Sequence, residues 1–133
     1  MPSPLEAFLA LHEATPLFQF TGFHLLSFGD GRAEMECPVA GPTQNVNGFL
    51  HGGVIALLVD EAGTVALASE DRGGRPGVTT DLNVSYLSPG LPPRVVAKAR
   101  ALKVGRTLGY VQVDIFNDDG RLVAQGRMTK YMP

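Results

Sequence analysis

The chain has 133 residues and a formal net charge of −2, which fits one domain over residues 1–133 that buries about two-thirds of the surface exposed by the unfolded chain. This charge excludes the strong basic excess by which proteins attract nucleic acid or anionic membranes. Cys37 is the single cysteine, so an internal disulfide is excluded. This cysteine usage, together with an N-terminus that lacks a basic and apolar leader, predicts a cytoplasmic protein.

The first half of the chain carries signals for a helix, a hairpin and a second, longer helix. Ser3, Pro4 and Glu6 form a capping box with proline at the first helical position, so a helix is expected from here to about residue 14, ending before Pro16. Two runs of alternating apolar residues within 22–39 flank a Gly-Asp-Gly turn, which is typical of a β-hairpin.

The second half is expected to be mostly strands. A loop over 41–48 leads to the long helix at about 53–69, and the cluster of charged residues, glycine and proline at 71–76 ends that helix. Strands are then predicted over 78–87, 94–104, 107–116 and 121–131. This order of elements is α+β, with a strand meander after the long helix.

The long helix is apolar on nearly every face, which is unlike an ordinary amphipathic surface helix. We therefore expect an antiparallel sheet to wrap around it. Asp60 and Glu61 lie at its centre, and an ionised carboxylate in a buried helix is costly unless it meets water, a polar cleft or a partner. At least one of the two is predicted to face a cleft.

A glycine-rich turn, Gly52-Gly53, stands at the start of the same helix. Free backbone N–H groups at a helix start can hold an anion, and an anion site combined with a carboxylate indicates hydrolysis through an oxyanion. Gly52 and Asp60 are eight residues apart, or about 12 Å along the axis, which an aspartate side chain does not bridge. The two residues are therefore expected to meet across a two-fold dimer with antiparallel central helices.

Several motifs occur in a characteristic order along the chain. They are Asn45, His51-Gly52-Gly53, Asp60, GVTTDLNVSYLSP at 77–89, KVGRT at 103–107 and AQGRMTK at 124–130. With the acid nine residues after His51, the chain resembles the hotdog-fold acyl-CoA thioesterases of the phenylacetate-pathway (PaaI-like) branch over residues 22–130. The resemblance implies a sheet wrapped around the helix, a homodimer with a continuous sheet that assembles to a homotetramer, and an acyl-CoA substrate near the subunit interface. It implies no metal and no cofactor apart from the coenzyme A of the substrate.

The resemblance also implies roles for single residues. Asp60 matches the catalytic acid, acting as base or nucleophile, and Glu61 is out of that register by about 100° around the helix. Gly52 matches the N–H donor that stabilises the oxyanion, the alternative being a glycine needed only for a tight turn. His51 matches a residue that orients the substrate or the loop, and a loop-packing histidine is the alternative.

Two further positions match the family's polar groups. Asn45 corresponds to a residue that places the thioester or the attacking group, and an asparagine that only caps its loop is the alternative. Thr79 corresponds to a hydroxyl that orients the water. Its neighbour Thr80 stays open for this role, because only one of two successive strand residues faces the site.

Four cations are candidates for binding the phosphates of coenzyme A: Lys103 and Arg106 first, with Arg127 and Lys130 second. The alternative is that they are solvated surface cations.

Other chemistries find little support in the sequence. His12 and His24 lack the spacing of a metal site, and neither a phosphate-binding loop nor a G-x-S-x-G elbow is present. Three rival functions remain: a hotdog hydratase, an acyl-carrier-protein thioesterase and a non-catalytic acyl-CoA-binding module. The spacing from HGG to Asp60 argues against the hydratase, and the lack of a DNA-binding helix pair weakens a lipid-sensing regulatory module.

Overall fold

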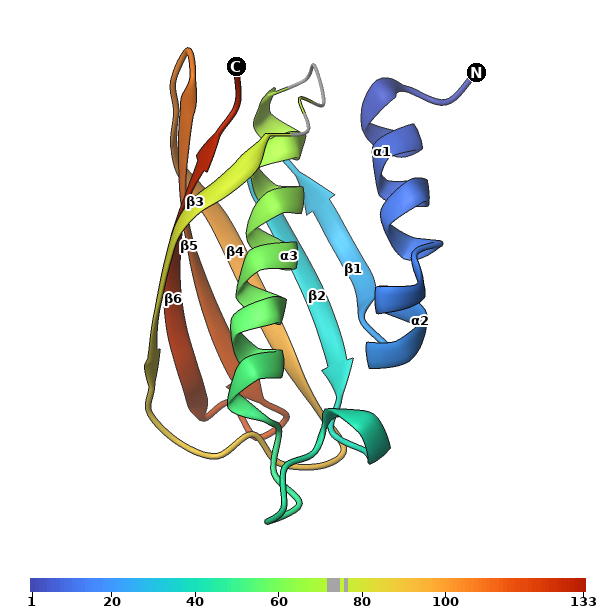
Figure 1. Ribbon diagram of the computed structural model, residues 1–133, viewed down its shortest axis with the longest axis vertical. Coiled ribbons are helices and arrows are strands. Elements are labelled where there is room, and N and C mark those ends of the chain that lie inside the picture. Colours follow the sequence, from blue (N-terminus) through green and yellow to red (C-terminus); the bar gives the residue numbers. More distant parts are fainter. Residues whose placement is uncertain (72–74, 76) are drawn as a thin grey trace.

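One long helix lies against a six-stranded antiparallel sheet in the computed structural model, which describes residues 1–71, 75 and 77–133 (Figure 1). In spatial order the strands are β1 (His24–Gly29), β2 (Arg32–Pro38), β4 (Arg94–Val104), β5 (Leu108–Asn117), β6 (Leu122–Tyr131) and β3 (Val78–Tyr86). The long helix, α3 (Gly52–Asp71), packs on the sheet, and α1 (Pro4–Glu13) and α2 (Pro16–Thr21) lie on the β1 side of α3. A 3-10 turn, η1 (Gly41–Thr43), follows β2. The predicted α+β architecture is confirmed.

The start of α1 follows the predicted capping box. The Ser3 hydroxyl accepts a hydrogen bond from the Glu6 N–H (3.1 Å), and the Glu6 carboxylate accepts one from the Ser3 N–H (2.7 Å). Helix α2 was not predicted, because Pro16 was interpreted only as the end of α1. Thr15 is the N-cap of α2 and Pro16 is its first residue, so the Thr-Pro pair that ends one helix also begins the next.

The order of strands in the sheet corrects one prediction. β1 and β2 form the expected hairpin, and β4, β5 and β6 form a meander. β3, however, does not neighbour β4: it pairs with β6 at the far edge of the sheet, while β2 pairs with β4. The connection from β2 to β3 runs through α3, which spans the sheet and delivers the next strand to the opposite edge.

The apolar surface of α3 is explained by its packing. Leu58, Val59 and Ala62 are fully buried against the sheet. A Cβ atom added at Gly126 of β6 would stand 2.7 Å from the Val59 side chain, so glycine is needed there for helix and sheet to approach closely. The segment Gly52–Glu70 is long and apolar enough to cross a membrane, but 56% of it is buried inside the fold, as in the core helix of a globular domain.

Candidate active site

Asp60 lies half-buried near the middle of α3, where it faces strand β3. Its Oδ1 accepts a hydrogen bond of 2.7 Å from the Thr79 hydroxyl. The neighbouring Thr80 is exposed and donates to the Thr129 carbonyl (3.3 Å), at a β-bulge that lies between Thr79 and Asp81. Of the two threonines that the sequence left open, Thr79 is the one that contacts Asp60.

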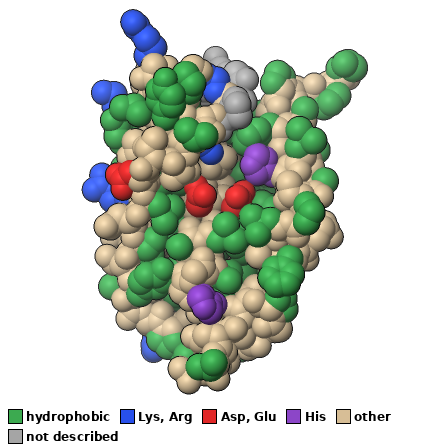
Figure 2. Space-filling model, in the orientation of Figure 1, with side chains coloured by type: hydrophobic (Ala, Val, Ile, Leu, Met, Phe, Trp, Pro, Cys, Tyr) green, Lys and Arg blue, Asp and Glu red, His purple; other side chains and the backbone are tan. Residues whose placement is uncertain are grey.

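Glu61 points to a different neighbour. Its Oε2 lies 3.9 Å from His12 Nε2 of α1, and this oxygen is buried without a hydrogen-bond partner among the described residues. Burial is the largest influence on the Glu61 carboxyl and raises its pKa. The charges of His12 and Lys130 oppose this rise, and that of Asp60 adds to it. The two adjacent carboxylates therefore face different elements: Asp60 accepts a hydrogen bond from β3, and Glu61 lies near His12 of α1. Figure 2 shows a small cluster of acidic side chains near the middle of this face, bordered by hydrophobic surface.

Lys130 is the candidate cation that the structure places in the interior. Its side chain faces α3, is only 8% exposed and donates a hydrogen bond of 2.7 Å from Nζ to the Thr64 hydroxyl. Burial lowers the pKa of Lys130, whereas Asp60 and Glu61 both act to raise it. Of the four candidate cations for the coenzyme phosphates, Lys130 is therefore the least accessible.

The N-terminus of α3 presents one free backbone donor. His51 Nδ1 accepts a hydrogen bond from the Gly53 N–H (2.8 Å), and the His51 carbonyl accepts bonds from Val54 and Ile55. No described residue accepts a hydrogen bond from the Gly52 N–H. Because Nδ1 is an acceptor, neutral His51 carries its proton on Nε2, as assigned from this hydrogen bond. An unpaired N–H at the first position of a helix is suited to an oxyanion.

Asn45 organises the loop before α3. Its Oδ1 accepts hydrogen bonds from the backbone N–H groups of Asn47 (2.9 Å) and Phe49 (3.1 Å), which is the geometry of an asparagine loop cap. Asn45 and Gly52 also line one open groove of about 360 Å³ together with Tyr86, whose hydroxyl donates to the Gly52 carbonyl (2.8 Å). The residues lining this groove do not include Asp60.

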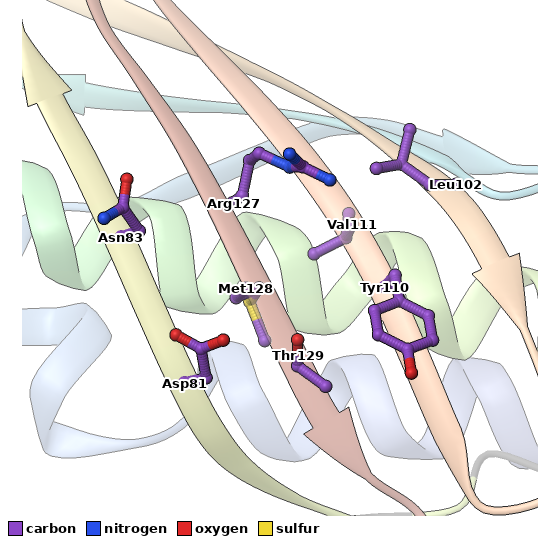
Figure 3. A pocket seen from close by; sticks show the side chains of 8 residues that line it. All are labelled: Asp81, Asn83, Leu102, Tyr110, Val111, Arg127, Met128 and Thr129. Atoms are coloured by element: carbon purple, nitrogen blue, oxygen red, sulfur yellow. The ribbon is translucent and has the colours of Figure 1, made fainter.

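The remaining candidate cations lie in two separate places. Lys103 and Arg106 are exposed at the turn between β4 and β5. Arg127 lies on the outer face of the sheet, beside a cavity of about 350 Å³ that Asp81 and Tyr110 also line (Figure 3). The segment 71–76 that was predicted to end α3 lies mostly outside the described residues; within it, Arg75 donates to the Arg106 and Met132 carbonyls at 2.6 Å each.

The structure adds three residues to the site that were not assigned from the sequence: His12, Thr64 and Tyr86. Tyr86 belongs to the motif at 77–89, but no role was given to it. The place of Thr64 could have been predicted from the sequence, because it follows Asp60 by four residues and so lies on the same face of the helix. No sequence pattern predicts the place of His12, since only the packing of α1 brings it to Glu61.

Known proteins resemble this chain in sequence and in fold. A family model described as "Thioesterase superfamily" matches residues 47–124. The human protein named acyl-coenzyme A thioesterase 13 is 43% identical over 110 residues, which cover 81% of this chain and 78% of the relative. The crystal structure of zebrafish thioesterase superfamily member 2 matches with a TM-score of 0.85 and 32% identity, covering 100% of both chains.

Two further solved structures are informative. A Streptococcus mutans protein bound to acetyl CoA matches with a TM-score of 0.76 and 28% identity, covering 84% of this chain and 88% of that protein. The Escherichia coli PaaI protein of the phenylacetic acid degradation operon matches with a TM-score of 0.81 over 94% of this chain and 89% of that protein, and at 22% identity it shows the shared fold alone. The predicted hotdog fold is thereby confirmed, and the chain belongs to the thioesterase superfamily.

Proposed function

We propose that this protein is an acyl-CoA thioesterase that hydrolyses a thioester to a free acid and coenzyme A. The proposal rests on two groups of one helix in a thioesterase-superfamily chain. One is the Gly52 N–H, from which no described residue accepts a hydrogen bond, and the other is the Asp60 carboxylate, which Thr79 orients. The name of the human relative and the acetyl CoA bound to the Streptococcus mutans protein support a coenzyme A thioester as the substrate. The PaaI-like branch is the proposed place of the chain within the superfamily.

The chemistry assigns one task to each group. Asp60 takes a proton from water while the water oxygen adds to the thioester carbonyl carbon, or its own carboxylate adds there to form an anhydride that water then hydrolyses. The carbonyl oxygen becomes an oxyanion, which the Gly52 N–H stabilises at the positive end of α3. The C–S bond then breaks and coenzyme A leaves as the thiolate. Thr79 holds Oδ1 of Asp60, which leaves Oδ2 for the reaction.

The site is proposed to be shared between two subunits. Gly52 and Asp60 are separated by about 12 Å along one helix, and the groove at Gly52 does not reach Asp60. β3, which carries Thr79, lies at an edge of the sheet with Val78 60% exposed and Tyr86 55% exposed. An open strand edge with exposed apolar side chains is a template for pairing with another chain. Antiparallel pairing of two β3 edges about a two-fold axis would give a continuous sheet and a homodimer, which we propose assembles further to a homotetramer.

Coenzyme A is proposed to bind through its phosphates at the exposed turn between β4 and β5. Lys103 lies near the end of β4 and Arg106 lies within that turn, and exposed cations at this spacing suit a phosphate group. Arg127 is a second candidate, on the outer face of the sheet. His51 and Asn45 are proposed to hold the loop that positions the thioester beside Gly52, with the His51 Nε2–H as a further donor.

Release of free thiol from a panel of acyl-CoA compounds tests this function. The proposal predicts steady-state turnover with at least one acyl-CoA of the panel. An acyl-carrier-protein thioesterase would hydrolyse acyl-carrier protein much faster than any acyl-CoA. A non-catalytic binding module would bind acyl-CoA in calorimetry without thiol release, and that result would refute the proposal.

A further inference from the structure

A buried lysine contacts α3, the helix that carries Asp60 and Glu61. Lys98 and Lys103 are exposed, as lysine side chains usually are, whereas Lys130 is 8% exposed and faces the helix from β6. Burying an ammonium group is costly unless another charge compensates for it. The position of Lys130 therefore calls for a charged partner.

The register of the sheet brings Lys130 to the side of α3 that carries Asp60. Lys130 on β6 is the direct pairing partner of Thr79 on β3. Thr79 donates to Asp60, and Lys130 donates to Thr64, both across 2.7 Å. Thr64 follows Asp60 by one helical turn on the same face of α3. Two paired strand residues thus contact two successive turns of the helix, which brings Lys130 to the face of α3 that carries Asp60.

The charges around this group come from two elements. α3 contributes the carboxylates of Asp60 and Glu61, and α1 contributes His12 at 3.9 Å from Glu61; the β3 contact, Thr79, is neutral. Nζ has three hydrogens to donate, and among the described residues only the Thr64 hydroxyl accepts one. Burial lowers the pKa of Lys130, and the charges of Asp60 and Glu61 act against that fall.

We infer that Lys130 is a positioning residue for Asp60: its buried ammonium, held by Thr64, stabilises the ionised carboxylate that thioester hydrolysis requires. The catalytic consequence rests on the proposed function, whereas the electrostatic effect does not require activity. An ammonium within about 4–6 Å of a carboxylate favours the charged form.

Titration of the full-length protein, followed by carbon-13 NMR of the aspartate carboxyl groups, tests the electrostatic effect directly. The Asp60 signal is assigned by its loss in Asp60→Asn. In Lys130→Met the titration midpoint of Asp60 should rise by about one pH unit or more. Lys98→Met, which removes a positive charge from the exposed surface, should leave it unchanged. An Asp60 midpoint that does not move in Lys130→Met overturns the inference.

A second variant, Thr64→Val, tests the inference even if Lys130→Met does not fold. Thr64→Val removes the hydroxyl that holds Nζ but keeps the charge and the volume. It should raise the Asp60 midpoint in the same direction by a smaller amount, because a loosely held ammonium stabilises the carboxylate less. If Lys130→Met does not fold, an unmoved midpoint in Thr64→Val overturns the inference in its place.

Kinetics separate this inference from the proposed function. At pH values below the Asp60 midpoint, Lys130→Met should lower kcat about tenfold. A midpoint that is higher by about one pH unit lowers the ionised fraction of Asp60 tenfold at those pH values. The loss should shrink as the pH rises, with KM nearly unchanged. A merely structural role would give a loss that is independent of pH, and this would overturn the catalytic part. A raised midpoint in a protein that hydrolyses no acyl-CoA would refute the proposed function and leave the electrostatic assignment standing.

Discussion

The Thr79 hydroxyl donates a hydrogen bond of 2.7 Å to Asp60 Oδ1, which ties the edge strand β3 to the central helix at the proposed catalytic acid. Because this bond orients the carboxylate, Thr79→Val should lower kcat about tenfold, on the scale of one lost hydrogen bond to a charged group. Thr79→Ser, which keeps a hydroxyl, should recover most of the rate. Thr80→Val is the matched control, since Thr80 is exposed and its hydroxyl donates to the Thr129 carbonyl rather than to Asp60. Equal losses in Thr79→Val and Thr80→Val would contradict the assignment.

Glu61 should influence stability more than catalysis. Burial raises the pKa of this carboxyl in the folded chain, and a group with a raised folded pKa contributes stability that is fully present below the unfolded pKa and is lost as the pH rises through the folded pKa. Glu61→Gln removes that loss. The free energy of unfolding of Glu61→Gln minus that of the wild type, measured by urea unfolding, should therefore increase from pH 4 to pH 8. Turnover should change little. A difference that stays constant with pH would show that the Glu61 charge does not carry the effect.

Arg106 should matter for the nucleotide end of the substrate. Arg106→Ala is expected to raise KM for acyl-CoA about fivefold, the scale of one lost hydrogen bond, with a smaller change in kcat, because a remote contact made equally in ground and transition states is uniform binding. An acyl N-acetylcysteamine, which lacks the nucleotide, should be unaffected. Arg121→Ala is the control for charge alone, since Arg121 is also exposed. Equal losses on both substrates would move the phosphate site elsewhere, with Arg127 the next candidate.

The Cys37 thiol should be unreactive toward thiol reagents in the folded protein. It is fully buried, and burial raises the pKa of its thiol to about 12, so very little thiolate is present at neutral pH. Labelling by a thiol-specific dye at pH 8 should be slow and should become fast only in denaturant. Rapid labelling of the native protein would contradict the buried position of this residue.

The sequence predicted most clearly those features that depend on periodicity. Alternation located the strands, and an apolar surface on every face identified α3 as the wrapped helix. Alternation states which face a residue occupies but not which strand lies beside it, so the pairing of β3 with β6 was not predictable. The role of Lys130 was missed for the same reason: it shares the inward face with Met128 and Met132, but only the register brings it to Thr64 and Asp60.

The shared site is the central claim, and a pair of inactive chains tests it. Asp60→Asn should lower turnover at least about a hundredfold, the usual scale for a lost general base. Gly52→Pro removes the proposed oxyanion donor at the first helical position, where proline is tolerated. Gly52→Ala keeps the N–H, and its Cβ would stand 3.5 Å from the nearest Tyr86 ring carbon, an ordinary contact. The loss in Gly52→Ala should therefore be much smaller than in Gly52→Pro.

Thiol release by hybrid dimers of Asp60→Asn and Gly52→Pro chains, purified through two different tags, is the decisive measurement. If Gly52 of one subunit works with Asp60 of the other, each hybrid contains one intact site and one doubly altered site. The hybrid should then recover about half of the wild-type turnover per dimer, while each parent stays inactive. Hybrids verified by mass spectrometry that release no thiol would show that the site lies within one chain.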